Sequence, residues 1–335
     1  MITRIRIKNF RCFVDAEVKL QPFSLVVGAN GSGKSNLLRF FEVVSRQGNQ
    51  VLNNKDGRAH LVINPSGWTK HQNHQMGDAG CNIELSDDSY VGGEAKEHLL
   101  FLSNKLPWQG AVFPIFNIEP DKVSGVESTV PNATVKADGS GTVQVLDALK
   151  NGDREDLFNQ IEENFRLYVP EVEKLSLRTV QPGTKQIQVR EAGLKNGPLP
   201  ATELSEGTRL ILAILTILHQ EKPPPMILLE DIDRGLHPRL FEYMAPLMMD
   251  IAKRLKVNIL ATTHNPYLVD CFKDDKKAVI IVEKKNGEST LATLASKLEG
   301  LDYDKIDPED MPLGNLWFSG HVGGIPGRFK KMIER

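Results

Sequence analysis

The segment Gly28–Ser35, which reads GANGSGKS, restricts the possible folds of this chain more than any other feature. The continuous apolar run Phe23–Val27 precedes it, and Ser35–Arg46 follows with apolar residues at helical spacing. The order is therefore buried strand, glycine loop and helix, the context that the pattern GxxxxGKS/T requires. Glycines allow consecutive backbone N–H groups to face one anion, and the start of a helix adds the positive end of its dipole. We therefore predict a phosphate-binding loop.

The residues of this loop are the candidate nucleotide ligands. Lys34 is expected to reach the β- and γ-phosphates, and the Ser35 hydroxyl is expected to bind Mg²⁺. A glycine-rich turn without a ligand is the alternative, but the strand before the loop and the helix after it disfavour that interpretation. The motif thus predicts ATP and Mg²⁺ as cofactors, held by Gly28, Ala29, Asn30, Gly31, Ser32, Gly33, Lys34 and Ser35.

A second apolar run, Met226–Asp231, ends in two carboxylates. We expect Glu230 to hold Mg²⁺ through water and Asp231 to position and polarise the attacking water. The usual order is Asp then Glu, so here each acidic side chain differs in length by one methylene. A displacement of about 1 Å can cost on the order of 100-fold in rate, which predicts slow hydrolysis. The alternative is a strand that simply ends in solvated acids.

His264 follows the apolar strand Val257–Thr262. In an open α/β sheet, the carboxyl ends of the strands form the edge where ligands bind. A histidine there can donate a hydrogen bond to the γ-phosphate, and we therefore predict that His264 distinguishes ATP from ADP. The alternative is a structural histidine.

Strands alternate with helices from Leu204 onward, which favours a mainly parallel α/β sheet. The first strand, Ile2–Ile7, alternates apolar and basic residues, and Val143–Tyr168 has helical spacing broken at Asn151-Gly152. Other expected elements are strands at 82–85, 99–102, 112–118, 174–180, 186–191, 226–229 and 277–283, and helices at 205–220 and 238–255.

Composition limits the cellular compartment and the partners that we expect for this chain. Its 335 residues carry a net charge of −2, so no global basic field attracts nucleic acid. The three cysteines lack metal-ligand or paired spacing, which is typical of a reducing compartment. The apolar run Leu210–Leu218 is too short to cross a bilayer, and the first residues, MITRIRIKNF, lack the apolar region that is typical of a signal peptide. We expect a cytoplasmic protein without a membrane partner.

Two features leave alternatives open. His237, within Asp233–Pro238, is either a ligand contact or part of a helix entrance with a proline in its first turn. The basic residues of the N-terminal segment are either a nucleic-acid stripe or a solvated strand face, and they are Arg4, Arg6, Lys8 and Arg11.

Five motifs in order resemble the SMC/RecF-like ABC ATPases, and within them the short AAA-type ATP-binding proteins of bacterial defence operons. They also resemble the ATPase half of OLD-family nucleases. The motifs are NFRCF (Asn9–Phe13), GANGSGKS, LSEGT (Leu204–Thr208), ILLEDIDRGLHP and ATTHNP. The resemblance implies an ABC-type P-loop ATPase with a mainly parallel sheet, N-terminal antiparallel strands and a small helical insertion lobe.

The same resemblance implies the domain organisation. One ATPase domain would be assembled from residues 1–46, which hold the phosphate loop, and residues 200–283, which hold the other motifs. Residues 47–199 would be an insertion with the helical lobe around 143–168, and residues 284–335 would be a C-terminal extension.

The resemblance also implies a role for LSEGT that the residues alone do not. By itself the segment is a helix start capped by Ser205. In ABC ATPases such a segment completes the nucleotide site of the other subunit in a head-to-tail dimer, which would make Ser205, Glu206 and Gly207 ligands in trans. Thr208 replaces the final glutamine of the transporter signature LSGGQ.

These points predict an ATPase that dimerises on ATP and controls a separate effector, such as a TOPRIM-type nuclease, in phage defence or DNA repair. DNA is a further expected partner. No second acidic cluster follows His264 and no long heptad run is present, so neither nuclease nor coiled-coil arms are expected in this chain. No clear Q-loop residue emerges among Gln47, Gln50, Gln72 and Gln75. The alternatives are a nucleotide-gated scaffold with negligible hydrolysis and a transporter ATPase.

Overall fold

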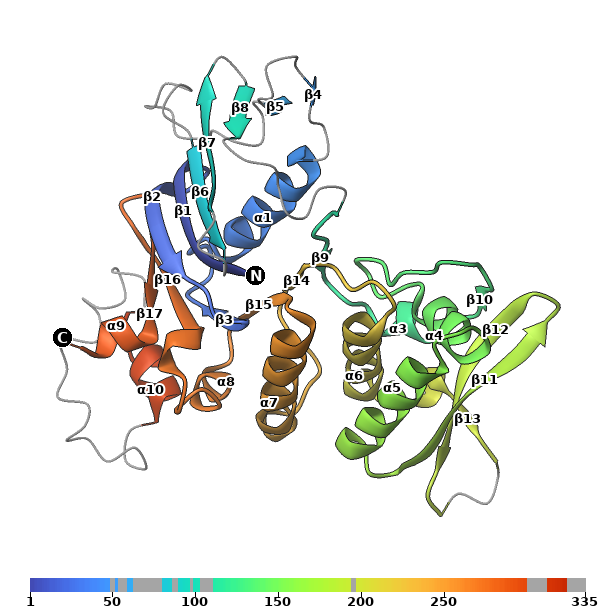
Figure 1. Ribbon diagram of the computed structural model, residues 1–335. Coiled ribbons are helices and arrows are strands. Elements are labelled where there is room, and N and C mark those ends of the chain that lie inside the picture. Colours follow the sequence, from blue (N-terminus) through green and yellow to red (C-terminus); the bar gives the residue numbers. More distant parts are fainter. Residues whose placement is uncertain are drawn as a thin grey trace. The chain divides into compact units, whose positions relative to one another are not determined.

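The computed structural model describes residues 1–48, 52–53, 59–62, 80–85, 90–96, 99–102, 111–193, 197–299 and 312–323. The chain divides into two compact units. The first contains residues 1–115, 224–232 and 248–335, and the second contains residues 116–223 and 233–247. Each unit is described by itself below, and both are drawn in Figure 1.

The first unit is built on a mainly parallel sheet that runs in the order β17-β16-β3-β15-β14-β9, where β9 (Ile115–Phe116) is the short last strand. Strands β16, β3, β15 and β14 are parallel neighbours, and β17 pairs with β16 in the antiparallel sense. Their carboxyl ends therefore lie along one edge. This sheet confirms the predicted α/β fold, and its strands are β3 (Phe23–Val27), β14 (Met226–Leu229), β15 (Asn258–Thr263), β16 (Val279–Lys285) and β17 (Glu288–Thr293).

A second sheet of the first unit is antiparallel and runs in the order β2-β1-β6-β7-β8-β5-β4. It confirms the expected N-terminal antiparallel strands. The sequence analysis did not predict β2, although its sequence FVDAEVK alternates apolar and charged residues as a half-buried strand does. The strands are β1 (Ile2–Phe10), β2 (Phe13–Lys19), β4 (Leu52–Asn53), β5 (Ala59–Val62), β6 (Gly80–Leu85), β7 (Tyr90–Lys96) and β8 (Leu99–Leu102).

Helix α1 (Lys34–Gly48) lies in one apolar core with side chains of both sheets. Phe10 of β1 meets Phe40 of α1 edge-on, with ring centroids 5.6 Å apart, and Phe40 meets Phe41 in the same way at 5.3 Å. Such edge-to-face pairs add to the stabilisation that burial supplies. The helix that follows the glycine loop is thereby held rigidly at the edge of the parallel sheet.

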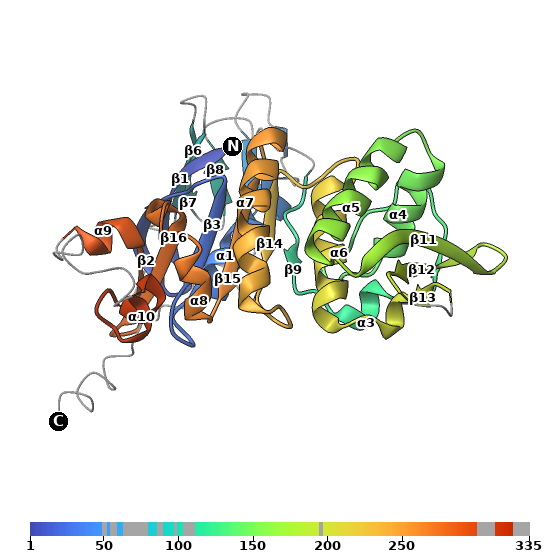
Figure 2. The same ribbon diagram turned by 90° about the horizontal axis from the view of Figure 1, so that it is seen from below.

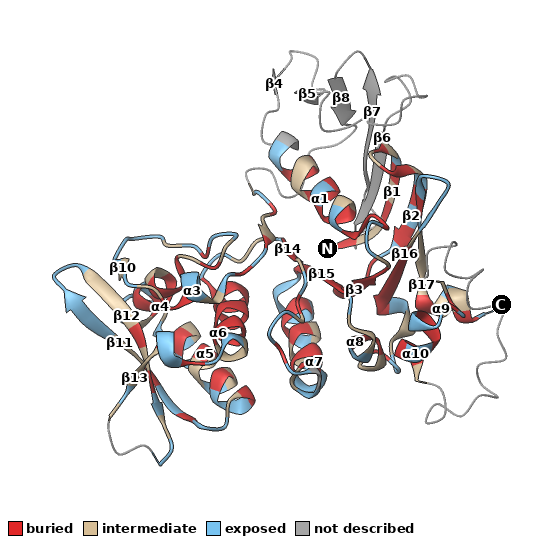
Figure 3. Ribbon diagram, turned by 180° about the vertical axis from the view of Figure 1, so that it is seen from behind, coloured by how far each residue is buried: buried red, intermediate tan, exposed pale blue. Residues whose placement is uncertain are grey.

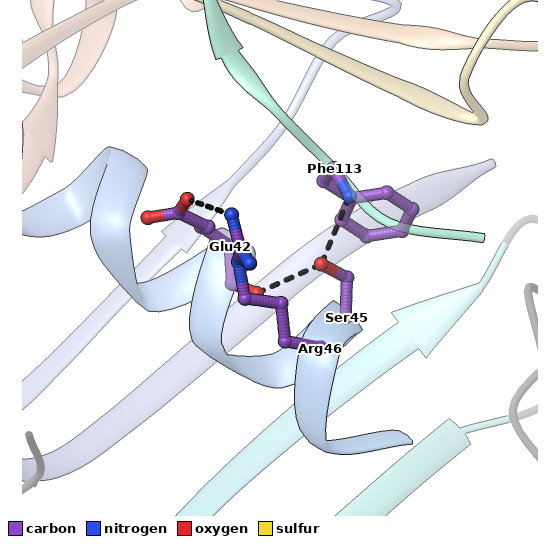
Figure 4. A network of polar contacts seen from close by, with 4 residues as sticks. All are labelled: Glu42, Ser45, Arg46 and Phe113. Atoms are coloured by element: carbon purple, nitrogen blue, oxygen red, sulfur yellow. Dashed lines mark hydrogen bonds and ion pairs between the residues drawn. The ribbon is translucent and has the colours of Figure 1, made fainter. Parts of the chain in front are cut away.

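The last turns of α1 also fix the chain that leads into the second unit (Figure 4). The Ser45 hydroxyl donates to the Glu42 carbonyl oxygen at 2.8 Å and accepts from the Phe113 backbone N–H at 2.9 Å. Glu42 also forms an exposed ion pair with Arg46 at 3.0 Å. Because Ser45 and Phe113 are buried, their bond satisfies an amide that water cannot reach.

The predicted strand at 112–118 is only a two-residue strand, β9 (Ile115–Phe116). Pro114 interrupts the apolar run and has no N–H to donate to a neighbouring strand. Apolar character alone therefore overestimated the length of this element.

The C-terminal part of the first unit adds short elements beside the parallel sheet. Helix α8 (Pro266–Asp270) contacts α10 (Leu313–Phe318), and the Gly314 N–H donates to Asp270 Oδ1 at 2.8 Å. Between them in sequence lie a 3₁₀ turn, η3 (Lys276–Ala278), and helix α9 (Leu294–Leu298).

The second unit packs helices against a small antiparallel sheet. Helix α6 (Glu206–His219) is buried on all sides from Arg209 to His219, as an almost wholly apolar helix requires (Figure 3). Helices α5 and α6 lie side by side (Figures 1 and 2). The remaining elements are α3 (Pro120–Val123), β10 (Glu127–Ser128), α4 (Thr142–Asn151), α5 (Glu155–Tyr168), β11 (Val172–Gln181), β12 (Thr184–Glu191), β13 (Leu199–Pro200) and η2 (Ala201–Glu203).

The helical segment predicted at 143–168 is thus present as α4 and α5, and it breaks at Gly152 as the sequence indicates. Helix α7 (Pro238–Leu255) has the predicted bounds. It begins in the second unit and ends in the first, and Pro246 lies in the second-unit part, two residues before the first unit resumes at Met248. A proline inside a helix removes one backbone hydrogen bond, so the change of unit coincides with a weak point of the helix.

Candidate nucleotide site

The glycine loop lies directly between β3 and α1, as the sequence predicts. Gly31 and Gly33 have φ values of 73° and 119°, which side chains disfavour. A Cβ atom on Gly28 would collide with the Val282 carbonyl oxygen, and one on Gly33 would lie 2.9 Å from Cys12 Sγ. The loop backbone therefore packs against its support at positions where only glycine fits.

Lys34 is almost buried, at 6% exposure, and its ammonium group remains on the loop. Its Nζ atom donates to the Gly28 carbonyl oxygen at 2.8 Å and to the Ala29 carbonyl oxygen at 3.3 Å. A buried cation needs hydrogen-bonded or anionic partners. The Ser32 hydroxyl, also buried, has no hydrogen-bond partner among the described residues. A buried cation and an unsatisfied hydroxyl in a glycine cradle fit a phosphate ligand.

Ser35 and Glu230 are brought together by the topology of the parallel sheet. Strand β14 ends just before Glu230, and β15 separates it from β3, which ends just before the loop. The Ser35 hydroxyl donates to Glu230 Oε1 at 2.5 Å. These are the two residues that the sequence assigns to Mg²⁺, and Mg²⁺ characteristically takes one or two protein ligands together with phosphate oxygens and waters. When bound, the metal would neutralise phosphate charge.

Among the described residues, no group of three or more histidine, cysteine, aspartate or glutamate side chains could hold a metal by itself. A metal at Ser35 and Glu230 would have these two protein ligands, with phosphate oxygens or waters in the remaining positions.

Asp231 adopts a left-handed backbone conformation, with φ of 49°. Its N–H donates to the hydroxyl of buried Thr262 at 3.0 Å, and the N–H of Ile232 donates to the Thr262 carbonyl oxygen at 3.0 Å. Aspartate and asparagine tolerate this conformation better than longer side chains do. The reversed order of the two acids therefore has a local cause: the longer glutamate reaches Ser35, and the aspartate suits a left-handed turn.

His264 is exposed and lies one residue beyond β15, at the same sheet edge as the loop, Glu230 and Asp231. Its position is set from both sides. The Thr263 hydroxyl accepts from the Asn265 N–H at 3.0 Å, and Asn265 Oδ1 accepts from the Tyr267 N–H at 3.0 Å, which caps α8. The first unit thus places four of the predicted features at one edge.

The LSEGT segment lies in the second unit, at the start of α6. Ser205 caps the helix, since its hydroxyl accepts from the Thr208 N–H at 3.1 Å. Ser205 and Glu206 are exposed, and a Cβ atom on Gly207 would lie 2.5 Å from the Gly235 carbonyl oxygen. Gly207 is therefore needed for close backbone packing within its own chain, which leaves the exposed face of the helix start available to a ligand.

The structure bears on the two features for which the sequence left alternatives open, His237 and the basic residues of the N-terminal strand. His237 Nδ1 accepts from the Arg239 N–H at 3.3 Å, the contact of a helix entrance. On β1, Arg6 donates two hydrogen bonds to Asp15, at 2.9 and 2.7 Å, and Arg4 pairs with Glu17 at 3.5 Å. The hydrogen bond from Arg6 keeps the pKa of Asp15 below its usual value. This strand face carries paired charges, which favours the solvated-face interpretation.

Some contacts of the site could not be found from sequence. Thr262, within ATTHNP, supports Asp231, and Cys12, within NFRCF, lies against the loop, but neither motif indicates these contacts. Ser289, which also lies against the loop, belongs to none of the five motifs. Of the possible Q-loop residues, Gln50, Gln72 and Gln75 and the side chain of Gln47 lie outside the described part of the chain.

Two family models match the sequence. One, described as "AAA ATPase domain", matches residues 1–106, and another, described as "AAA domain, putative AbiEii toxin, Type IV TA system", matches residues 131–270. The solved SMC head bound to the C-terminal winged-helix domain of ScpA superimposes with a TM-score of 0.50 and 15% identity, over 87% of this chain and 97% of that one. The fold is that of an SMC/RecF-like ABC-type ATPase. The SMC head domain from Thermotoga maritima gives a TM-score of 0.49 and 16% identity, over 87% of this chain and 98% of that one.

A short stretch of this chain is also similar to a curated protein. A stretch of 44 residues is 43% identical to the OLD nuclease of Thermus scotoductus. This stretch makes up 13% of this chain and 8% of that protein. The chain therefore matches only a small part of that relative. Within the described residues, no helix is both long enough and apolar enough to span a membrane.

Proposed function

We propose that this ABC-type ATPase binds Mg-ATP at Gly28–Ser35, hydrolyses it slowly, and closes on a second copy of itself to control a separate effector. The observation that carries the proposal is the hydrogen bond from Ser35 to Glu230, because it joins the two metal-binding motifs at one sheet edge. Asp231 would polarise the attacking water, and His264 would sense the γ-phosphate.

Closure in trans is supported by the start of α6. Capped Ser205 and exposed Glu206 present a helix N-terminus, which attracts an anion through its backbone N–H groups and dipole. The family matches of both halves of the chain agree with such a site, in which one copy supplies the loop and the other supplies Ser205, Glu206 and Gly207.

The effector is proposed to be a nuclease of the TOPRIM type, and the setting to be phage defence or DNA repair, with DNA as an additional partner. The stretch shared with an OLD nuclease supports a nuclease as the effector. The match to a toxin–antitoxin family model supports a defence setting. The SMC head to which the fold is similar is itself bound to a partner domain.

The proposal is tested by phosphate release from Mg-ATP at steady state. We expect the wild type to hydrolyse ATP and Lys34→Ala to abolish this turnover. Tight binding of ATP without turnover would instead favour a nucleotide-gated scaffold, in which the bound nucleotide acts only as a switch. Mass spectrometry of proteins that co-purify with the untagged native protein then identifies the effector, and a transporter subunit in that set would contradict the assignment.

A further inference from the structure

The hairpin of β16 and β17 supports the glycine loop from beneath, although residues 279–293 lie outside both family matches. The Val282 carbonyl oxygen of β16 fills the space where Gly28 would carry a Cβ atom. Strand β17 packs against β2, so the hairpin is fixed to both sheets of the first unit. The loop thus rests on a segment far away in the sequence.

One residue of this hairpin, Ser289, makes two hydrogen bonds to that region. Its hydroxyl donates to the Ser32 carbonyl oxygen at 2.6 Å, and its N–H donates to the Cys12 carbonyl oxygen at 2.7 Å. Ser289 is 2% exposed, so water does not compete for either bond. A Cβ atom on Gly33 would lie 2.9 Å from the Ser289 hydroxyl, which shows how closely the two backbones approach.

The bond to Ser32 fixes more than one oxygen atom. The Ser32 carbonyl and the Gly33 N–H belong to the same planar peptide unit, and in a trans peptide they point in opposite directions. No peptide bond among the described residues is cis. Because Ser289 holds the carbonyl oxygen on the hairpin side, the Gly33 N–H is directed to the opposite side of the loop.

This constraint matters because the peptide could otherwise rotate. Gly33 has φ of 119° and no side chain, so the backbone around it resists a change of orientation only weakly. A rotated peptide would present its carbonyl oxygen, and not its N–H, to a bound anion. Phosphate loops bind anions through backbone N–H groups that converge on one point.

We propose that Ser289 is a positioning residue for nucleotide binding, whose hydroxyl locks the Ser32–Gly33 peptide with its N–H toward the phosphates. The inference rests on the proposed binding of Mg-ATP at this loop. It assigns a role in the nucleotide site to a strand that the sequence places in a C-terminal extension.

The test compares Ser289→Ala, Ser289→Thr and the matched control Thr290→Val in the full chain. Thr290 is the next residue on β17, carries a hydroxyl and is exposed on the opposite face. Calorimetric titration measures the Kd for Mg-ATP and Mg-ADP, thermal melting without nucleotide measures the fold, and steady-state assays measure KM and kcat.

Ser289→Ala is expected to weaken both nucleotides about three- to tenfold, the range for loss of one hydrogen bond. KM should rise by the same factor with kcat unchanged, because ground state and transition state lose the same contact. Ser289→Thr, which keeps the hydroxyl, should restore affinity, and Thr290→Val should match the wild type.

Wild-type affinity in Ser289→Ala would overturn the proposal, and so would an equal loss of affinity in Thr290→Val. If the wild-type protein itself fails to bind Mg-ATP, the proposed function is wrong. The wild-type titration therefore distinguishes a failure of the proposed function from a failure of the role proposed for Ser289.

Discussion

The Ser35 hydroxyl donates a hydrogen bond to Glu230 Oε1 at 2.5 Å, although 195 positions separate the two residues in the chain. The contact exists because β3 and β14 flank β15 in the same parallel sheet and end at the same edge. A hydroxyl and a carboxylate held in this way would be preorganised for the proposed metal ion, because the cost of ordering them would be met during folding and not during binding.

The first prediction concerns this pair. Ser35→Ala and Glu230→Gln should each weaken binding of ATP in the presence of Mg²⁺ by about tenfold, the size of a lost charge-assisted contact. The double variant should lose little more than either single variant, because both changes disrupt the same metal site.

Calorimetry in magnesium and in EDTA provides the check. Without Mg²⁺ the three variants should bind ATP as the wild type does. Losses that add fully in the double variant, or that persist in EDTA, would show that the two residues do not act through one metal.

Lys34→Ala should weaken the binding of Mg-ATP about 100-fold or more, since it removes a nearly buried cation that is proposed to contact the β- and γ-phosphates. Lys285→Ala is the matched control, because Lys285 lies on β16 in the same unit with its side chain exposed. Undiminished affinity in Lys34→Ala, measured by calorimetric titration, would remove the loop from the nucleotide site.

The motifs at Gly28–Ser35 and Met226–Asp231 were readable from sequence because each couples a buried strand to residues of fixed chemistry. Parallel strands end at a common edge, so the meeting of Ser35 with Glu230 followed from the predicted α/β alternation. Helix α7 was likewise predicted with its observed bounds, because its apolar stripe has a clear helical period.

Other contacts depend on tertiary packing that has no local signal. Strand β17 is short and polar, and nothing in its sequence indicates that its serine lies against a loop far away in the chain. The sequence does not indicate the left-handed backbone conformation of Asp231 either, yet this conformation accounts for the order of the two acids.

That account predicts the outcome of restoring the usual order. The double variant Glu230→Asp, Asp231→Glu should turn over ATP on the order of 100-fold more slowly still than the slow wild type, because the turn of this protein is shaped for the observed order and the exchange displaces both carboxylates by about 1 Å. The shorter acid no longer reaches Ser35, and the longer one occupies a left-handed residue. Turnover equal to or faster than the wild type in a steady-state phosphate-release assay would contradict this explanation.

Ser205→Arg should leave the Kd of Mg-ATP at the loop of the same chain unchanged and prevent closure of two copies. The added side chain would cover the helix N-terminus that is proposed to meet the partner's γ-phosphate. Light scattering with a non-hydrolysable ATP analogue measures closure as an increase in mass.

Ser205→Gly is the control for capping, because glycine at a helix N-cap costs only a few tenths of a kcal/mol relative to serine. It should close normally. A normal mass increase in Ser205→Arg would refute the proposed action in trans. A mixture of Ser205→Arg with Lys34→Ala protein should partly regain turnover if the sites fire independently, because one composite site in a mixed dimer is then intact.

The most direct test of the account is the behaviour of Asp231→Asn. Asparagine keeps the left-handed backbone and nearly the same shape, but it cannot act as a carboxylate toward water. We predict that this variant binds Mg-ATP with the affinity of the wild type in a calorimetric titration and releases phosphate at least about 100-fold more slowly. Turnover at the wild-type rate in Asp231→Asn, with ATP binding intact, would contradict the assignment of the hydrolytic site.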